Sequence, residues 1–181
     1  MVRRLLACGL ALAAMVRAAE ARADSMTIPV VRFALGPAFH LAPQQDPSTR
    51  IAADITAGFT YDGGSFTKGG SVGWLLHPEL GYTYDGLGLN AFNATCGFGV
   101  GTLAVDVAYQ PRLIVGTVDD AGAAVGMRNG IMLHAFVDIA SVEVGHQFVR
   151  WGGAFHHDVR VFLGINPASI VWGIAGLLRQ R

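Results

Sequence analysis

The sequence predicts an all-β fold: a single antiparallel up-and-down β-barrel of about eight strands. Long stretches of the chain alternate between apolar and polar or small side chains, which is the period of a β-strand. Many of these stretches are at least twice the roughly 5–6 residues of an ordinary strand. Hydrophobic residues make up 52% of the chain, but no apolar run after residue 23 approaches the roughly 20 residues of a membrane-spanning helix. High hydrophobicity without such a run favours a barrel.

The clearest stretch is RIAADITAGFTYD, residues 50–62. One column of alternate side chains contains Ile51 and Ile55 and ends in aromatic residues. The other column contains Asp54 and Thr56 and carries all the charge. Because successive side chains of a strand point to opposite faces, one face is apolar and the other is polar. This pattern is typical of a strand with hydrocarbon on one side and a polar interior on the other.

The N-terminal segment, residues 1–23, has the three parts of a secretory signal peptide. Two arginines precede an apolar run at residues 5–16, and an Ala-Arg-Ala cleavage site lies at residues 21–23. A membrane anchor is the alternative, but the apolar run is too short to cross a bilayer as a helix. We therefore expect export, with a mature chain that begins at Asp24.

The charges of the chain exclude a basic surface for nucleic acid. The whole sequence has 13 Lys+Arg and 13 Asp+Glu, and removing residues 1–23 takes away four arginines and one glutamate. The remaining chain is acidic overall, and its only lysine is Lys68. Its only cysteine is Cys96, so no internal disulfide is expected.

Eight alternating stretches define the predicted strands of one domain, residues 24–166. Turn signals such as Asp85-Gly86 and Gly152-Gly153 separate several of them. A polar loop at residues 42–49 and a glycine-rich connection at residues 63–73 separate others. The predicted strands cover residues 30–41, 50–62, 74–85, 87–101, 103–118, 126–139, 140–151 and 155–166.

Two places interrupt this pattern. The apolar column of the fourth stretch changes phase near Asn90, from Leu87 and Leu89 to Phe92, which predicts a β-bulge. The boundary between the sixth and seventh strands, near Ala140, contains neither glycine nor proline. We therefore place that turn only by the lengths of the flanking stretches.

The tail, residues 167–181, follows a different period. Pro167 is suited to the first position of a helix, and Ile170, Ile174 and Leu178 recur at helical spacing. A ninth strand is the competing interpretation, because some apolar residues also alternate. An odd strand number is unusual for bacterial barrels, so the sequence favours a short interfacial helix.

The polar columns predict a barrel interior that is filled by ion pairs and hydrogen bonds rather than an open pore. Eight-stranded barrels have interiors just wide enough for side chains to fill, and buried charges must be paired. A proton or ion path is the alternative. The predicted interior network consists of Arg32, Asp54, Glu79, Asp106, Arg112, Arg128, Asp138, Glu143, Asp158 and Arg160. The other ionisable residues of these columns are Asp62, His77, Asp85 and His134.

No catalytic, cofactor or metal site is predicted. Adjacent His156 and His157 point to opposite faces of a strand, so they cannot share one ion. Ser141 and Glu143 share one face while His146 lies on the other, so these residues cannot form a catalytic triad in a regular strand. We therefore expect no enzymatic activity; a lipid-modifying enzyme of the outer membrane is the weaker alternative.

With its signal peptide and repeated two-faced strands, the chain resembles the small eight-stranded outer-membrane β-barrels of Gram-negative bacteria over about residues 28–166. The resemblance implies an outer-membrane location, contact with outer-membrane lipid and insertion by the barrel assembly machinery. Members of this class usually end on a strand with a terminal aromatic residue. This chain continues beyond its last predicted strand, so the resemblance implies an internal assembly signal at residues 162–166.

These observations favour an outer-membrane barrel with a structural or interaction role. A soluble periplasmic barrel that binds an apolar ligand, similar to lipocalins, is the alternative. Alternation alone fits both, because the apolar column would face lipid in the first and line a cavity in the second. The direction in which Ile55 and Asp54 point therefore distinguishes the two.

Overall fold

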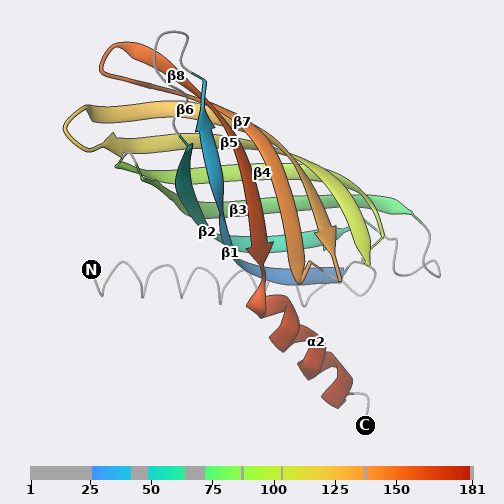
Figure 1. Ribbon diagram of the computed structural model, residues 1–181. Coiled ribbons are helices and arrows are strands. Elements are labelled where there is room, and N and C mark those ends of the chain that lie inside the picture. The colour runs from blue at the N-terminus through green and yellow to red at the C-terminus, as the bar shows by residue number, and fades with distance from the viewer. Residues whose placement is uncertain are drawn as a thin grey trace.

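The computed structural model describes residues 26–41, 49–63, 72–86, 88–102, 104–136 and 138–179. Eight antiparallel strands form a closed barrel, followed by one helix (Figure 1). The elements are β1 (Met26–His40), β2 (Thr49–Asp62), β3 (Gly73–Asp85), β4 (Leu89–Gly101), β5 (Val105–Val118), β6 (Gly122–Ala135), β7 (Ala140–Trp151), β8 (Ala154–Ile165) and α2 (Pro167–Arg179). The predicted fold class and strand number are confirmed.

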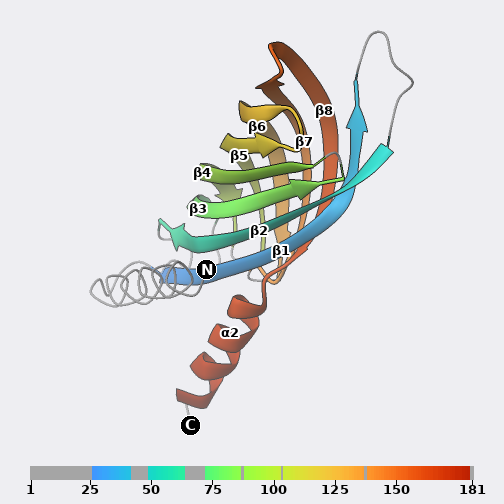
Figure 2. The same ribbon diagram turned by 90° about the vertical axis from the view of Figure 1, so that its left-hand side faces the viewer.

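Each strand pairs with its neighbours in sequence, and β8 pairs with β1 to close the barrel (Figure 2). The chain therefore passes alternately between two ends of the barrel. We call the end with α2 and the start of β1 the helix end; its connections are residues 63–72, 102–104 and 136–139. We call the other end the turn end; its connections are residues 41–48, 86–88, 119–121 and 152–153.

The apolar columns point outward and the polar columns point inward. In β2, Ile51 and Ile55 are 67% and 51% exposed, whereas Asp54 between them is 3% exposed. The same alternation runs through β3 to β8. The lipocalin-like alternative, in which the apolar column lines an inner cavity, is therefore wrong. We use inward and outward columns below for these two sets of side chains.

Two local predictions need correction. β3 and β4 pair in one continuous register from Gly73↔Gly101 to Tyr84↔Asn90, so no bulge interrupts the strand near Asn90. Leu89 instead begins β4 as an inward residue and is 1% exposed. The phase change arises because Leu89 and Ala91 are apolar residues of the inward column, where they belong to a buried cluster, whereas Phe92 belongs to the outward column.

The sixth strand begins and ends earlier than predicted. It covers Gly122–Ala135, and turn residues follow at positions 136, 138 and 139. Phe136 has a φ of 56° and is exposed rather than inward, and Asp138 has a φ of 60°. Left-handed φ values substitute for the glycine that such a turn usually contains. The sequence offered no composition signal for this turn.

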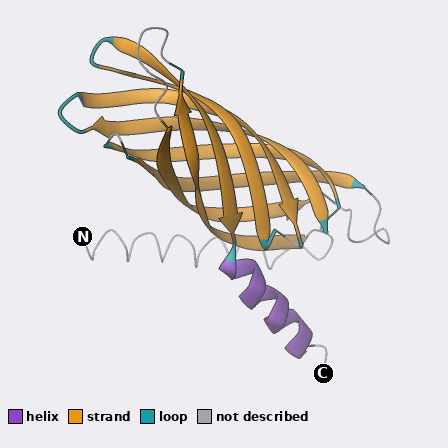
Figure 3. Ribbon diagram, in the orientation of Figure 1, coloured by secondary structure: helices purple, strands orange, loops and turns teal. Residues whose placement is uncertain are grey.

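The tail forms a helix, so the ninth-strand alternative is wrong (Figure 3). The Asn166 side chain extends the barrel seam, because its Oδ1 accepts the Val31 N–H at 2.9 Å. Trp172 then packs against inward-facing Ile28 and Leu75 at the helix end. Among the described residues, no helix is both long enough and apolar enough to cross a membrane.

Some predicted features lie outside the described residues. These are the signal peptide at residues 1–23 and most of the connections at residues 42–49 and 63–73.

Candidate functional site

The candidate site is the barrel interior, where the inward columns bring charged side chains together. All ten residues of the predicted network are buried, with at most 4% of each residue exposed. Arg50 at the start of β2, as well as His40, His77 and His134, are also buried there. Buried charges are stable only when they are paired and hydrogen-bonded. The arrangement of partners therefore decides what the interior can do.

The central part of the interior is a chain of alternating cations and anions. Arg32 Nη1 lies 2.7 Å from Glu79 Oε1, and Arg112 Nη1 lies 3.6 Å from Glu79 Oε2. Arg112 also pairs with Glu143, since its Nη2 lies 3.3 Å from Glu143 Oε2. The other carboxylate oxygen of Glu143, Oε1, lies 3.1 Å from Arg128 Nε. These contacts link β1, β3, β5, β6 and β7 across the lumen.

The central chain ends at Asp54 on β2. Arg128 pairs with the Asp54 carboxylate, whose other oxygen accepts a hydrogen bond from Thr83 Oγ1 at 2.7 Å. The Arg128 guanidinium also lies over the Phe162 ring, 4.9 Å from its centre. A cation above an aromatic face is stabilised further when both are shielded from water. Phe162 therefore belongs to the network although it carries no charge.

A second group of charges lies toward the turn end. Arg160 Nη2 contacts Asp85 at 2.6 Å and Asp158 at 3.2 Å. Arg50 Nη1 is 4.0 Å from Asp85, and His40 Nδ1 is 2.8 Å from Asp158. The ten predicted residues are thus divided: Asp158 and Arg160 belong to this group, and the other eight lie in the central chain or at the helix end.

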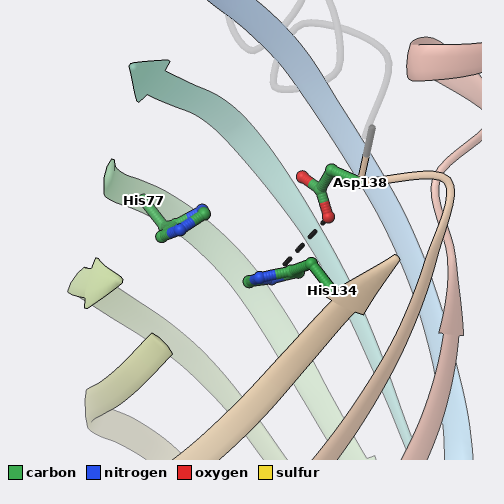
Figure 4. Close-up of side chains that lie close together, drawn as sticks. All are labelled: His77, His134 and Asp138. Atoms are coloured by element: carbon green, nitrogen blue, oxygen red, sulfur yellow. Dashed lines mark ion pairs between the residues drawn. The ribbon is translucent and has the colours of Figure 1, made fainter. Parts of the chain in front are cut away.

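A third group lies toward the helix end and is centred on two stacked imidazoles (Figure 4). The rings of His77 and His134 have centroids 4.5 Å apart. Asp106 Oδ1 lies 2.8 Å from His134 Nδ1 and 3.4 Å from His77 Nε2. Asp138 lies on the other side and pairs with Arg32 at 2.9 Å. Arg32 thereby connects this group to the central chain.

Glycines on the inward columns provide the space for these long side chains. A Cβ added at Gly130 would lie 2.7 Å from Glu143 Oε1, and one added at Gly164 would lie 2.4 Å from Ser141 Oγ. Both distances are too short for an unshifted contact. The inward glycines are therefore explained by volume, because an eight-stranded barrel has little room inside.

Apolar clusters fill the interior near both ends of the barrel. At the turn end, Trp151 packs against a cluster of Leu89, Ala91, Ile114, Val118, Ala124 and Val149. At the helix end, Trp172 packs on Ile28 and Leu75. The interior therefore contains apolar clusters beside the charged groups, in surroundings that strengthen electrostatic contacts.

The alternative sites of the sequence analysis are separated as strand geometry requires. Ser141 and Glu143 are inward, and His146 is outward. His156 stacks on Trp151, with ring centres 3.6 Å apart, whereas His157 is exposed and stacks with His146. None of these residues is brought to the His77 and His134 group.

Sequence reasoning placed His77 and His134 on inward columns but gave them no partner, and it omitted Arg50 and His40 from the interior. His40 and Asp158 are direct partners on the neighbouring strands β1 and β8, as are His134 and Asp106 on β6 and β5. The contacts of His77 with Asp106 and His134 reach non-adjacent strands, and the sequence pattern contains no signal for them. Comparisons of the chain with protein families, with curated proteins and with solved structures gave no match.

Proposed function

We propose that this chain is an outer-membrane β-barrel protein with a structural or interaction role, exported by the signal peptide at residues 1–23. The observation that carries the proposal is the outward column. Across the eight strands that the structure describes, this column contains no Asp, Glu or Lys, and its single arginine is Arg150, next to the end of β7. Water would tolerate charges on this surface, whereas bilayer hydrocarbon would not.

The aromatic residues of the outward column support the same proposal. Tyr61 and Trp74 lie together at the helix end of β2 and β3, with ring centres 5.7 Å apart. Tyr82 and Tyr84 are exposed near the turn end of β3. Aromatic residues with a polar edge are enriched at the two interfaces of membrane barrels. These positions are those expected for two girdles.

The packed interior supports a role without an open pore. Its charges are arranged in ion pairs that link strands across the lumen, so a continuous water column would require these contacts to separate. The tail supports an interfacial position for α2, because Ile170, Val171 and Ile174 are exposed on the helix while Trp172 packs on the barrel. Interaction partners would be outer-membrane lipid and, during insertion, the barrel assembly machinery.

Fractionation of the native host tests the location. We expect an outer-membrane band that resists a urea wash and changes mobility on a gel when the sample is boiled. A soluble periplasmic band without a heat-dependent shift would overturn the proposal.

A matched pair of arginine substitutions tests the lipid contact directly. We expect Ile55→Arg to reduce the yield of heat-modifiable barrel strongly, since an arginine near the bilayer midplane costs about 2–4 kcal/mol. The control, Ala121→Arg, places the same side chain in the exposed turn between β5 and β6. Equal yields of the two variants would contradict a lipid-facing wall.

A further inference from the structure

The helix-end histidine group has the composition of a metal site. His77 comes from β3, His134 from β6 and Asp138 from the turn between β6 and β7 (Figure 4). Each offers one ligand atom, and these atoms lie within 4.8 Å of one another. All three residues are buried, and both histidines are 0% exposed. Two imidazoles with a carboxylate form a donor set that suits zinc and similar transition metals.

One carboxylate lies close to both imidazoles: Asp106 is hydrogen-bonded to His134 and is 3.4 Å from His77, whose Nε2 has no hydrogen-bond partner. Asp106 Oδ1 contacts Nδ1 of His134 and Nε2 of His77. The other nitrogens of the two rings are Nε2 of His134 and Nδ1 of His77. Histidines that bind a metal generally donate their other N–H to a carboxylate, which fixes the tautomer and the ring orientation. Asp106 is in the position to do this for both rings.

His134 faces Asp138 directly, and His77 is linked to Asp138 through Thr60. His134 Nε2 lies 3.7 Å from Asp138 Oδ1 and has no hydrogen-bond partner, although it is fully buried. Thr60 Oγ1 lies 3.0 Å from His77 Nδ1 and donates to Asp138 Oδ2 at 3.1 Å. His77 Nε2 is also buried without a hydrogen-bond partner, as are several arginine nitrogens of the network, and each such atom requires an explanation. A cation at this place would give the His134 lone pair a partner.

The charges of the connected network favour a cation at the same place. The central chain and the helix-end group together contain Arg32, Arg112 and Arg128 against Asp54, Glu79, Asp106, Asp138 and Glu143. Among the described residues, Asp106 pairs with histidines and with no arginine. Two carboxylates thus exceed the arginines, and one divalent cation would compensate for both.

The backbone of residues 136–139 provides an independent sign of function. Phe136 and Asp138 both adopt left-handed φ values, 56° and 60°. Asparagine and aspartate tolerate this region, but a bulky residue such as phenylalanine is a genuine outlier there. Such outliers persist where the surrounding structure requires them, often at ligand sites. Here the turn directs the Asp138 carboxylate back into the barrel, where it is 3% exposed.

We propose that His77, His134 and Asp138 bind one divalent transition metal of the zinc class inside the helix end of the barrel. Asp106 is the positioning residue for both imidazoles, and Thr60 or a water supplies the fourth donor. Zn–N bonds of about 2.0–2.1 Å require the ligand atoms to approach closely, so the rings turn out of their stack on binding. The metal would join β3, β6 and the turn that follows β6.

Metal uptake by the full-length mature barrel, folded in detergent and stripped with a chelator, tests the site. We expect one equivalent of Co²⁺ to bind with the visible absorption of a tetrahedral nitrogen–oxygen site, and Zn²⁺ to displace it. His134→Gln and Asp138→Asn should abolish this signal. Asp106→Asn should weaken affinity by about 10–100-fold, the usual effect of changing a residue that orients a metal ligand.

Matched controls separate the site from general histidine binding. His146→Gln and His157→Gln make the same chemical change on the outward columns and should leave the Co²⁺ signal unchanged. The heat-dependent gel shift identifies folded protein for every variant. If a site variant does not fold, chelator treatment of the wild-type barrel replaces it: removal of the metal should lower the unfolding temperature, and added Zn²⁺ should restore it.

Three results would overturn the proposal. The first is an absence of stoichiometric Co²⁺ binding by the folded wild-type barrel. The second is equal binding by wild type and His134→Gln. The third is an unfolding temperature that changes neither on chelator treatment nor on addition of Zn²⁺.

Discussion

Glu79 and Leu80 are neighbours on β3 but lie on opposite surfaces of the barrel wall. Leu80 is 60% exposed on the outward column. Glu79 is buried between Arg32 and Arg112. The outward surface requires only that each side chain be apolar, whereas the inward surface requires a specific partner for each charge. Substitutions and insertions should therefore change the stability of the barrel differently on the two surfaces. On the outward surface, the effect of a charged substitution should also depend on its depth in the bilayer.

The largest expected effect comes from exchanging the two surfaces. Inserting one residue between Tyr109 and Gln110 of β5 would move Arg112 outward and Leu113 inward, because side-chain direction alternates strictly. We expect no heat-modifiable barrel on a gel. Inserting two residues at the same point restores the alternation and should recover part of the folded band. A folded one-residue variant would show that the columns do not determine folding.

Removing one inward charge should have the next largest effect. Glu79→Gln leaves Arg32 and Arg112 without their shared carboxylate, which should cost about 3–5 kcal/mol of unfolding free energy. Guanidinium titration of the barrel in phospholipid vesicles measures this loss. Leu80→Ala on the outward column should cost less than about 1 kcal/mol, because lipid replaces the lost contacts. Similar losses for both variants would remove the distinction between the surfaces.

Arginines on the outward column should show a dependence on depth. Leu113→Arg, near the centre of β5, should cost about 2–4 kcal/mol, and Thr117→Arg, near the turn end, should cost about 0–1 kcal/mol. The same vesicle titration measures both variants. Equal losses for the two variants, or a larger loss for Thr117→Arg, would mean that the bilayer midplane does not cross the strands near their centres.

The smallest effect concerns aromatic residues on the two surfaces. Phe162→Leu removes the ring beneath the Arg128 guanidinium and should cost about 1 kcal/mol, the usual size of a partly shielded cation–π contact. Phe98→Leu makes the same change on the outward column, where Phe98 is exposed. Its unfolding free energy should remain close to that of wild type. A larger loss for Phe98→Leu would argue against the cation–π contribution.

The strand number and the inward columns were predictable from sequence, because both follow from a strict period of two. Arg32, Asp54 and Glu79 all lie on the side that alternation assigned to them. The helix at residues 167–179 was also predictable, because its apolar residues recur at helical spacing and Pro167 is suited to the start of a helix. These features depend on local patterns that the bilayer or the core imposes on every strand.

The pairing inside the barrel could not be predicted. Arg128 and Asp54 are 74 residues apart in sequence, and their contact depends on the tilt and stagger of all the strands between them. The stacking of His77 on His134 has the same origin. The turn at residues 136–139 was also missed in detail, because its left-handed residues are not the glycines that usually mark such a turn.

Because the number of strands is even, the first strand begins and the last strand ends at the same end of the barrel. Met26, where β1 begins, and Pro167, where α2 begins, both lie at the helix end, so either terminus can be extended without crossing the barrel. In the part of the chain that the structure describes, the turns at residues 119–121 and 152–153 lie on the opposite side. The β5–β6 turn is open, because a Cβ added at Gly122 would meet no atom within 4 Å, as is also true of Gly152 and Gly153 in the β7–β8 turn. A peptide tag inserted there and a tag after Arg179 would report the two sides of a membrane separately.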